Sequence, residues 1–424
     1  MRVLLIEPSV YTEQGLYKVP IRATRYLALV LPHLAALTPA DIEVEIAYDA
    51  CENLDSECDF ASYDLVGITA QTIHMKRTLE LARKVTKAGR PVVVGGPATR
   101  EGNHQLVPVL ARFCTSVVVG EAEELWLEFL NDLKQGNPKK VYQDDNIVSL
   151  KGLPVPRFDL VDLSCISEPH VLPCMTSRGC PRACTFCSYR SYSKWRMRPV
   201  DEVIAELSVY KTRFGIPRVV FRDDDFLVHP GRSREILEKM IPLELEWGCQ
   251  TDLSLSNHAD LVDLAIKSGM RSVSLGLESI VEKNRNAVRK SFFAMDEAED
   301  LLQTLYEREI EVQVNIMFGF DHDTPDVFDE TVDFLVRNHV GTALFSILLP
   351  IPGTPIHKQL LTENRLIDDR LPGSGDHLYV GFIPKHMTVE RLVEGYLHAQ
   401  QRFQHERKDP VLWLGKNNHI WSES

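Results

Sequence analysis

Three cysteines lie close together in the segment Ser177-Arg178-Gly179-Cys180-Pro181-Arg182-Ala183-Cys184-Thr185-Phe186-Cys187, with the spacing Cys-x3-Cys-x2-Cys. Three thiolates on one short loop can each bind one iron of a cubic [4Fe–4S] cluster, which leaves the fourth iron without a protein ligand. An open iron can bind a substrate or a cofactor, whereas a cluster held by four cysteines usually only transfers electrons. The spacing therefore predicts an open iron–sulfur site with Cys180, Cys184 and Cys187 as metal ligands and catalytic residues.

Other uses of cysteine fit this chain less well. A structural zinc site needs four ligands, typically as two paired knuckles, and the sequence has no second Cys-x2-Cys motif. A disulfide framework is also disfavoured, because nine cysteines in 424 residues are dilute and odd in number. The other six are scattered and lack ligand spacing: Cys51, Cys58, Cys114, Cys165, Cys174 and Cys249.

The cysteine motif resembles the signature of radical S-adenosylmethionine (SAM) enzymes, in which an aromatic residue precedes the last cysteine. Phe186 occupies that position. The resemblance implies that the amine and carboxylate of SAM chelate the open iron. One electron from the cluster would then cleave SAM to methionine and a 5′-deoxyadenosyl radical. A reducing partner such as flavodoxin or ferredoxin would supply that electron.

Composition limits the remaining function classes. Hydrophobic residues make up 44% of the chain and charged residues 25%, which is typical of a soluble globular protein. No apolar run reaches the roughly 18–20 residues that span a bilayer, and the N-terminus runs straight into an expected strand rather than a targeting peptide. The net charge of -13 disfavours extended contact with a nucleic-acid backbone. We therefore expect a cytoplasmic protein with no membrane span and no nucleic-acid partner.

A local basic cluster follows the cysteines. It consists of Arg190, Lys194, Arg196 and Arg198, with Tyr189, Tyr192 and Trp195 between them. We expect this cluster to meet SAM, a substrate phosphate or an electron donor rather than RNA.

Short apolar runs alternate with amphipathic stretches over residues 1–145. This alternation predicts a parallel sheet wound on both faces, and ligands of such sheets bind at the carboxyl ends of the strands. Three loops lie at that edge, and their candidate binding residues are Thr69, Gln71, Thr72, Gly95, Gly96, Gly120 and Glu121. Paired glycines let a backbone lie close to a flat ligand, although glycines also simply end strands.

The segments Tyr63–Thr69, Val92–Pro97 and Val118–Glu123 resemble the cobalamin-binding domain that precedes many radical SAM domains. The resemblance covers about residues 1–145 and implies a corrinoid on these loops. One feature departs from that family, because the lower-ligand motif Asp-x-His-x-x-Gly is absent. His74 follows the first loop but lies outside such a motif, and no imidazole need coordinate cobalt.

A second alternating series follows a Pro-containing connector at residues 146–165. Six strand–helix units over residues 166–356 match the partial (β/α)6 barrel of radical SAM proteins, and residues 357–424 form a helical C-terminal extension. Barrels of parallel strands carry their chemistry at the carboxyl ends of the strands. The cysteine motif follows the first of these strands, where that rule places it.

Several strand ends match secondary motifs of the radical SAM family. The resemblance implies SAM contacts from Asp223, Asp224, Asp225, Gln250, Asp252, Glu278 and Gly319, together with Phe186. Three adjacent carboxylates are costly to crowd together unless cations or hydroxyls use them, although a solvated acidic turn is the alternative. Alternation along the third strand places Gln250 and Asp252 on one face and Cys249 on the other, so Cys249 is expected to be a packed thiol.

Two reactions from different classes remain open. In the first, bound cobalamin carries a methyl group to an unactivated carbon of a small-molecule natural product. In the second, the N-terminal domain does not use cobalamin, and the radical serves a dehydration, epimerisation or cyclisation, as in the diol dehydratases of aminoglycoside biosynthesis. Nothing in the sequence names the substrate.

Overall fold

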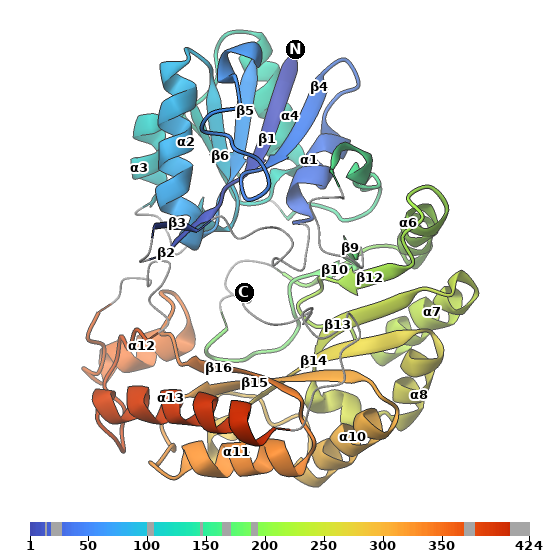
Figure 1. Cartoon of the computed structure of the whole chain (residues 1–424), viewed down its shortest axis with the longest axis vertical. Coiled ribbons are helices and arrows are strands. Elements are labelled where there is room, and N and C mark those ends of the chain that lie inside the picture. The colour runs from blue at the N-terminus through green and yellow to red at the C-terminus, as the bar shows by residue number, and fades with distance from the viewer. Residues whose placement is uncertain are drawn as a thin grey trace. The chain divides into compact units, whose positions relative to one another are not determined.

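The computed structural model describes residues 1–12, 15–17, 28–99, 106–144, 147–162, 171–187, 194–368 and 378–407. The chain forms two compact units, the first within Met1–His170 and the second from Val171 onward (Figure 1). The expected candidates Cys165, Tyr189, Arg190 and Tyr192 lie outside the described residues. No helix in the described part of the chain is long and apolar enough to cross a membrane.

The first unit contains a six-stranded parallel sheet in the order β4-β1-β5-β6-β7-β8. Its strands are β1 (Arg2–Glu7), β4 (Glu43–Tyr48), β5 (Leu65–Thr69), β6 (Val92–Gly95), β7 (Ser116–Val119) and β8 (Val141–Gln143). Its helices are α1 (Val30–Leu37), α2 (Met75–Lys87), α3 (Leu106–Phe113) and α4 (Ala122–Lys134), and β2 (Val10–Thr12) pairs with β3 (Gly15–Tyr17) in a separate ribbon. The predicted doubly wound sheet is confirmed.

Successive side chains of these strands point to opposite faces of the sheet, and an apolar layer packs on each face. Leu4, Ile6 and Val66 belong to the core that receives α2 and α3. On the other face, Gly67 lies beneath Leu5 and Trp126 of α4, where an added Cβ would come within 2.8 Å of Leu5. In Figure 1, α2 and α3 cover one face of this sheet and α1 and α4 the other.

The second unit also contains six parallel strands, in the order β16-β15-β14-β13-β12-β9. They are β9 (Leu172–Cys174), β12 (Arg218–Phe221), β13 (Glu246–Asp252), β14 (Met270–Glu278), β15 (Glu311–Phe318) and β16 (Thr342–Ile347). The helices are α6 (Val200–Thr212), α7 (Pro230–Met240), α8 (Ala259–Lys267), α9 (Glu282–Ala287), α10 (Met295–Glu307), α11 (Val327–Arg337), α12 (Pro355–Thr362) and α13 (Val389–Glu406). This arrangement confirms the predicted partial (β/α)6 barrel.

Local sequence signals start several of these helices. Pro355 occupies the first turn of α12, and the Thr354 hydroxyl before it accepts a hydrogen bond from the His357 N–H over 3.3 Å. Thr388 caps α13 in the same way, accepting from the Arg391 N–H over 3.1 Å. Helix α13 belongs to the C-terminal extension, and it packs against α11 and β16 of the barrel.

A short ribbon, β10 (Ser177–Arg178) with β11 (Arg196–Met197), flanks the cysteines. Arg198, which follows it, is buried and forms an ion pair with Glu206 over 2.8 Å. Arg198 is therefore part of the core and is paired with Glu206. The sequence had instead predicted that it meets SAM, a substrate phosphate or an electron donor.

Candidate active site

The three cysteines lie on one loop, residues 179–187, which we call the cysteine loop. It follows β9 and β10 at the carboxyl end of the barrel strands. Cys184 is buried, Cys180 and Cys187 are half-buried, and none of the three is in a disulfide. The Thr185 N–H donates to the Val288 carbonyl over 3.1 Å, and its carbonyl accepts from the Ile356 N–H over 3.1 Å. The fold thus places the loop where the sequence predicted it.

The thiols fit a cluster better than a single ion. Burial raises the pKa of Cys180 to about 12 and that of Cys184 to about 11. Such thiols stay protonated until a metal displaces the proton. Within the described residues, no three Cys, His, Asp or Glu side chains converge on one metal ion. A cubic cluster binds each thiolate through a separate iron, so its three ligands need not converge on one ion.

Asp223 is fully engaged inside the protein. Its Oδ1 accepts from the Thr176 hydroxyl over 2.7 Å and from the Ser177 hydroxyl over 2.5 Å, and its Oδ2 accepts from the Thr176 N–H over 2.9 Å. Burial raises the pKa of this carboxyl, and the hydrogen bonds oppose that effect. Asp223 therefore fixes the entry to the cysteine loop, and the geometry does not direct it toward a ligand.

Asp225 and Asp252 form a buried acidic pair behind the loop. Asp225 accepts from the Thr251 hydroxyl over 2.7 Å, and burial together with the charge of Asp252 raises the pKa of Asp225 to about 7. Arg182, from the cysteine loop itself, lies 2.7 Å from Asp252 Oδ2. These two carboxylates are thus partnered by the protein.

Asp224 and Gln250 are the more accessible members of the predicted set, the first half-buried and the second exposed. The Gln250 side chain donates to the Asp224 carbonyl over 3.4 Å. Cys249, which precedes Gln250 on β13, is completely buried, as expected of a packed thiol.

Glu278 ends β14 in a left-handed conformation, with φ of 65°, at an irregularity in its pairing with β15. Its Oε1 accepts a hydrogen bond from Lys290 Nζ over 2.8 Å. A Cβ at Gly276 would lie 2.6 Å from Lys290 Nζ, so glycine at that position makes room for the pair. Strained backbone of this kind occurs preferentially at functional sites.

Gly319 follows β15, with φ of 102°. An added Cβ would lie 2.8 Å from the Phe382 ring and 3.2 Å from Leu392, both from the C-terminal extension. The Gly319 N–H donates a hydrogen bond to the Asp323 carboxylate over 2.7 Å. The ring of the next residue, Phe320, packs against Phe186 of the cysteine loop, with the ring centroids 6.0 Å apart. The lack of a side chain at Gly319 is thus explained by packing.

The loops of the first unit differ in how much space they leave for a corrinoid. A Cβ at Gly96 would lie 2.8 Å from the Ala70 carbonyl oxygen and 2.9 Å from Thr69 Oγ1, so the backbone fills the space beside this glycine. By contrast, the nearest atom to a Cβ at Gly120 is the Asp144 carbonyl oxygen at 3.6 Å. Gln71 is exposed at the same edge of the sheet. Gln71 and Gly120 are therefore the members of this set that leave room for a bound group.

The other predicted residues of this edge are Thr69, which is buried, and Thr72, Gly95 and Glu121, which are half-buried. His74 is buried, and burial lowers its pKa to about 4, so its imidazole is neutral. Its Nδ1 is enclosed without a hydrogen-bond partner. The side chain therefore packs into the first unit.

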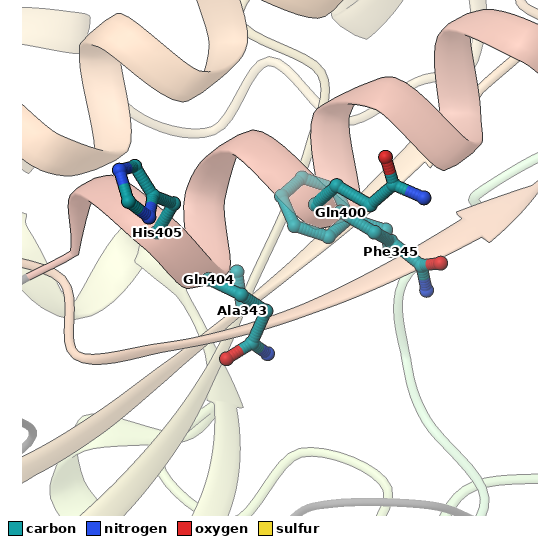
Figure 2. Close-up of a pocket in the computed structure, with 6 residues that line it drawn as sticks. Ala343, Phe345, Gln400, Gln404 and His405 are labelled. Atoms are coloured by element: carbon teal, nitrogen blue, oxygen red, sulfur yellow. The ribbon is translucent and has the colours of Figure 1, made fainter.

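A separate pocket of about 570 Å³ lies on the helix-covered outer side of the second sheet. Figure 2 shows Phe345 and Ala343 of β16 facing Gln400, Gln404 and His405 of α13. The Phe345 ring also contacts Phe403 of α13, with the ring centroids 5.6 Å apart. This pocket is therefore distinct from the strand ends that carry the cysteines.

Sequence reasoning missed Lys290 and Arg182. Lys290 lies twelve residues after its partner Glu278, beyond a helix that the sequence did not predict. Arg182 stands inside the motif, but its partners come from β13 and the segment that follows. The carboxylates at Asp225, Asp252 and Glu278 were the available signal for these two cations, since buried carboxylates require cationic partners.

Residues 175–335 match the Radical SAM superfamily. The chain is 29% identical over 354 residues to bacteriochlorophyllide d C-12(1)-methyltransferase of Chlorobaculum tepidum, which covers 81% of this chain and 75% of that protein. It is 24% identical over 395 residues to an anaerobic magnesium-protoporphyrin IX monomethyl ester cyclase of Cereibacter sphaeroides, covering 85% of this chain and 63% of the cyclase.

A solved structure shows the same fold. It is the radical SAM methyltransferase TsrM from Kitasatospora setae, with cobalamin and a [4Fe–4S] cluster bound. The TM-score is 0.65 at 17% identity, and the likeness covers 85% of this chain and 78% of TsrM. The matched residues 175–335 include the cysteine loop and the strands from β12 to β15.

Proposed function

We propose that this chain is a radical SAM enzyme with a cobalamin-binding-type N-terminal domain, and that it methylates an unactivated carbon of a small molecule with the help of cobalamin. The observation that carries the proposal is the extent of the similarity to a methyltransferase. It covers 81% of the chain, which is more than the second unit alone provides. The relative therefore shares both the cysteine loop and part of the N-terminal sheet.

Cys180, Cys184 and Cys187 would hold the [4Fe–4S] cluster, which with bound SAM supplies carbon-radical chemistry. The chain's own residues then have to bind and orient the two reactants. We assign the charged end of SAM to the half-buried Asp224 and to the Glu278–Lys290 pair, whose opposite charges match an ammonium and a carboxylate. Phe186, which is half-buried on the cysteine loop and backed by the buried Phe320, offers an aromatic face for the adenine.

The corrinoid would lie on the first unit at the carboxyl edge of β5 and β7. Gln71 and Gly120 leave space there, and Thr72 and Glu121 flank them. A parallel sheet of this topology binds its ligands at that edge. A flat tetrapyrrole is the first substrate to test, because the named relatives act on bacteriochlorophyllide d and magnesium-protoporphyrin IX monomethyl ester.

The test uses protein that is produced with hydroxocobalamin and purified anaerobically. It is incubated with a tetrapyrrole substrate and with SAM that carries a labelled methyl group. We expect one corrinoid per chain beside the cluster absorbance, and labelled methyl groups in the product. Protein that takes up no corrinoid but still consumes SAM and turns over substrate would overturn the methylation proposal.

A second candidate is a radical reaction without methyl transfer, such as cyclisation, dehydration or epimerisation. The similarity to the monomethyl ester cyclase favours it, since that relative covers 85% of this chain. The same labelling experiment separates the two, because only methylation places the label in product. A reductant protein such as flavodoxin or ferredoxin is part of either proposal.

A further inference from the structure

Arg182 stands between two of the three cluster ligands and reaches out of the cysteine loop to the neighbouring strand ends. Its Nη2 donates to Asp252 Oδ1 over 3.2 Å and to Ser254 Oγ over 2.5 Å, and its Nε lies 2.7 Å from Asp252 Oδ2. The same Nε lies 3.8 Å from Asp225 Oδ2. One side chain thus ties the loop to the segment after β12, to the end of β13 and to the turn after β13.

The guanidinium plane also rests on an aromatic ring. The central carbon of Arg182 lies 4.2 Å from the centroid of the Phe292 ring. Phe292 is itself held, because its carbonyl accepts a hydrogen bond from the Asn257 side chain over 3.0 Å. Nη2 alone donates a hydrogen bond to Asp252, and Nε meets the second oxygen as an ion pair. A planar, delocalised cation can contact both carboxylate oxygens and also lie over an aromatic ring, whereas lysine cannot.

The two carboxylates that Arg182 meets are almost completely buried. Asp252 is 6% exposed and Asp225 is 4% exposed. Two buried carboxylates near each other require cations, and loss of a partner leaves an uncompensated charge. Arg182 is one such cation, and the buried Lys290 is another that acts on the same pair.

The two halves of the cysteine loop are held in different ways. The second half is fixed by backbone hydrogen bonds that Thr185 forms with Val288 and Ile356. The first half runs from Cys180 to Cys184, and the Arg182 side chain fastens it to the strand ends. The Arg182 N–H also points to Cys180, with N–Sγ of 3.4 Å. A hydrogen bond to a ligand sulfur is a recognised influence on cluster properties.

We propose that Arg182 is a positioning residue that acts through Asp252 to pre-form the Cys180–Cys184 half of the cluster site. It sets how firmly the cluster is held, and it does not touch the substrate. This role rests on ligation of the cluster by the three cysteines, but it is independent of methylation and of cobalamin.

The experiment measures iron rather than turnover. Wild type, Arg182→Met, Arg182→Lys and Asp252→Asn are reconstituted anaerobically, and the rate of iron loss to an excess of ferrous chelator is followed. We expect iron loss from Arg182→Met to be about tenfold to a hundredfold faster, the usual effect of removing a residue that orients a metal ligand. Arg182→Lys keeps the charge but not the fork or the stacking, so its rate should be intermediate. The electron paramagnetic resonance spectrum of the reduced cluster should change in Arg182→Met.

Arg308→Met is the matched control, because Arg308 is 54% exposed and lies 3.6 Å from Asp263 at the surface. Its iron-loss rate should equal that of wild type, and the melting temperature of each apoprotein reports on folding separately. The double variant Arg182→Met/Asp252→Asn should lose iron little faster than Arg182→Met, since both changes remove one contact. A wild-type rate in both Arg182 variants, or fully additive effects in the double variant, would overturn the proposal. Failure of methylation with these iron results intact would affect only the proposed function.

Discussion

Lys290 donates a hydrogen bond to Glu278 with Nζ–Oε1 of 2.8 Å, in a part of the barrel where both side chains are nearly enclosed. Burial alone would lower the pKa of Lys290, but the attraction of Glu278 outweighs it and raises that pKa. The lysine is therefore positively charged, and its charge also acts on Cys184 of the cysteine loop. A carboxylate and an ammonium thus stand together at the end of β14, beside the expected cluster.

This pair predicts a separation between SAM binding and cluster binding. Glu278→Gln and Lys290→Met should each weaken SAM binding at least about tenfold, a loss of roughly 1.4 kcal/mol, while the iron content stays normal. Equilibrium binding of SAM to the reconstituted protein measures the first quantity, and iron analysis the second.

Breaking a buried pair destabilises the fold, so the variants need a control. The double variant Glu278→Gln/Lys290→Met removes both charges and should recover part of the melting temperature that either single change loses. Unchanged SAM affinity in both single variants would show that the pair only stabilises the barrel.

The cluster ligands predict a simple result. Changing Cys180, Cys184 or Cys187 to Ala should remove most of the iron and all SAM cleavage, because each thiolate binds its own iron. Cys249→Ala is the control, since Cys249 is a buried cysteine outside the loop. It should keep four irons per chain, and a triple loop variant that also kept them would refute the assignment.

Both sheets could be predicted from the sequence because buried parallel strands are continuous apolar runs. β5, β6 and β7 are short runs of this kind, almost entirely apolar and buried. The elements that were missed carry weaker local signals. β8 is short and mostly exposed, and α9 contains the buried polar residues Asn284 and Arg285 in place of an apolar stripe.

Side-chain partners were harder to predict than the elements, because they depend on contacts distant in sequence. The acidic run at Asp223–Asp225 was predicted as one SAM-binding group, yet its members differ. Asp223 binds the residues before the cysteine loop, and Asp225 faces Asp252 and Arg182. Alternation along the chain could place these side chains on faces but could not say which would find a partner.

Gly96 and Gln71 predict different outcomes at the edge of the first sheet. Gly96→Ala should destabilise the first unit, by roughly 1–2 kcal/mol for the left-handed backbone alone, and more because the new Cβ meets the Ala70 backbone. Gln71→Trp changes an exposed side chain, so it should leave stability unchanged but lower corrinoid uptake by filling the space above the sheet. Thermal melting and the corrinoid absorbance of purified protein measure the two effects. Normal corrinoid content in Gln71→Trp would place the ligand elsewhere.

Glu7 predicts how the stability of the first unit depends on pH. One carboxylate oxygen of Glu7 is enclosed without a hydrogen-bond partner, and burial raises the pKa of the side chain from 4.5 to about 7. Below pH 4.5 the residue is protonated in both states and costs nothing. Between pH 4.5 and 7 the unfolded chain releases the proton while the folded chain keeps it, so stability falls as the pH rises.

His74 acts in the opposite direction over part of this range. Its folded pKa of about 4 lies below the ordinary 6.5, so between these values its effect raises stability with pH. The two effects offset each other below pH 6.5, and the loss due to Glu7 shows most clearly from there to just above pH 7. Glu7→Gln cannot ionise, so the variant should match wild type near pH 4 and be more stable near pH 8. The expected gain is on the order of 3 kcal/mol.

Hydrogen exchange of the β1 peptide, measured from pH 5 to 8 with rates corrected for intrinsic exchange, reports this difference within the intact chain. Glu43→Gln, at a highly exposed position at the start of β4, is the control and should follow the wild-type profile. If protection of β1 in Glu7→Gln falls between pH 6.5 and 8 as steeply as in wild type, then Glu7 remains charged in the folded state. Its enclosed oxygen would then have to be stabilised by a group that binds at this end of the sheet.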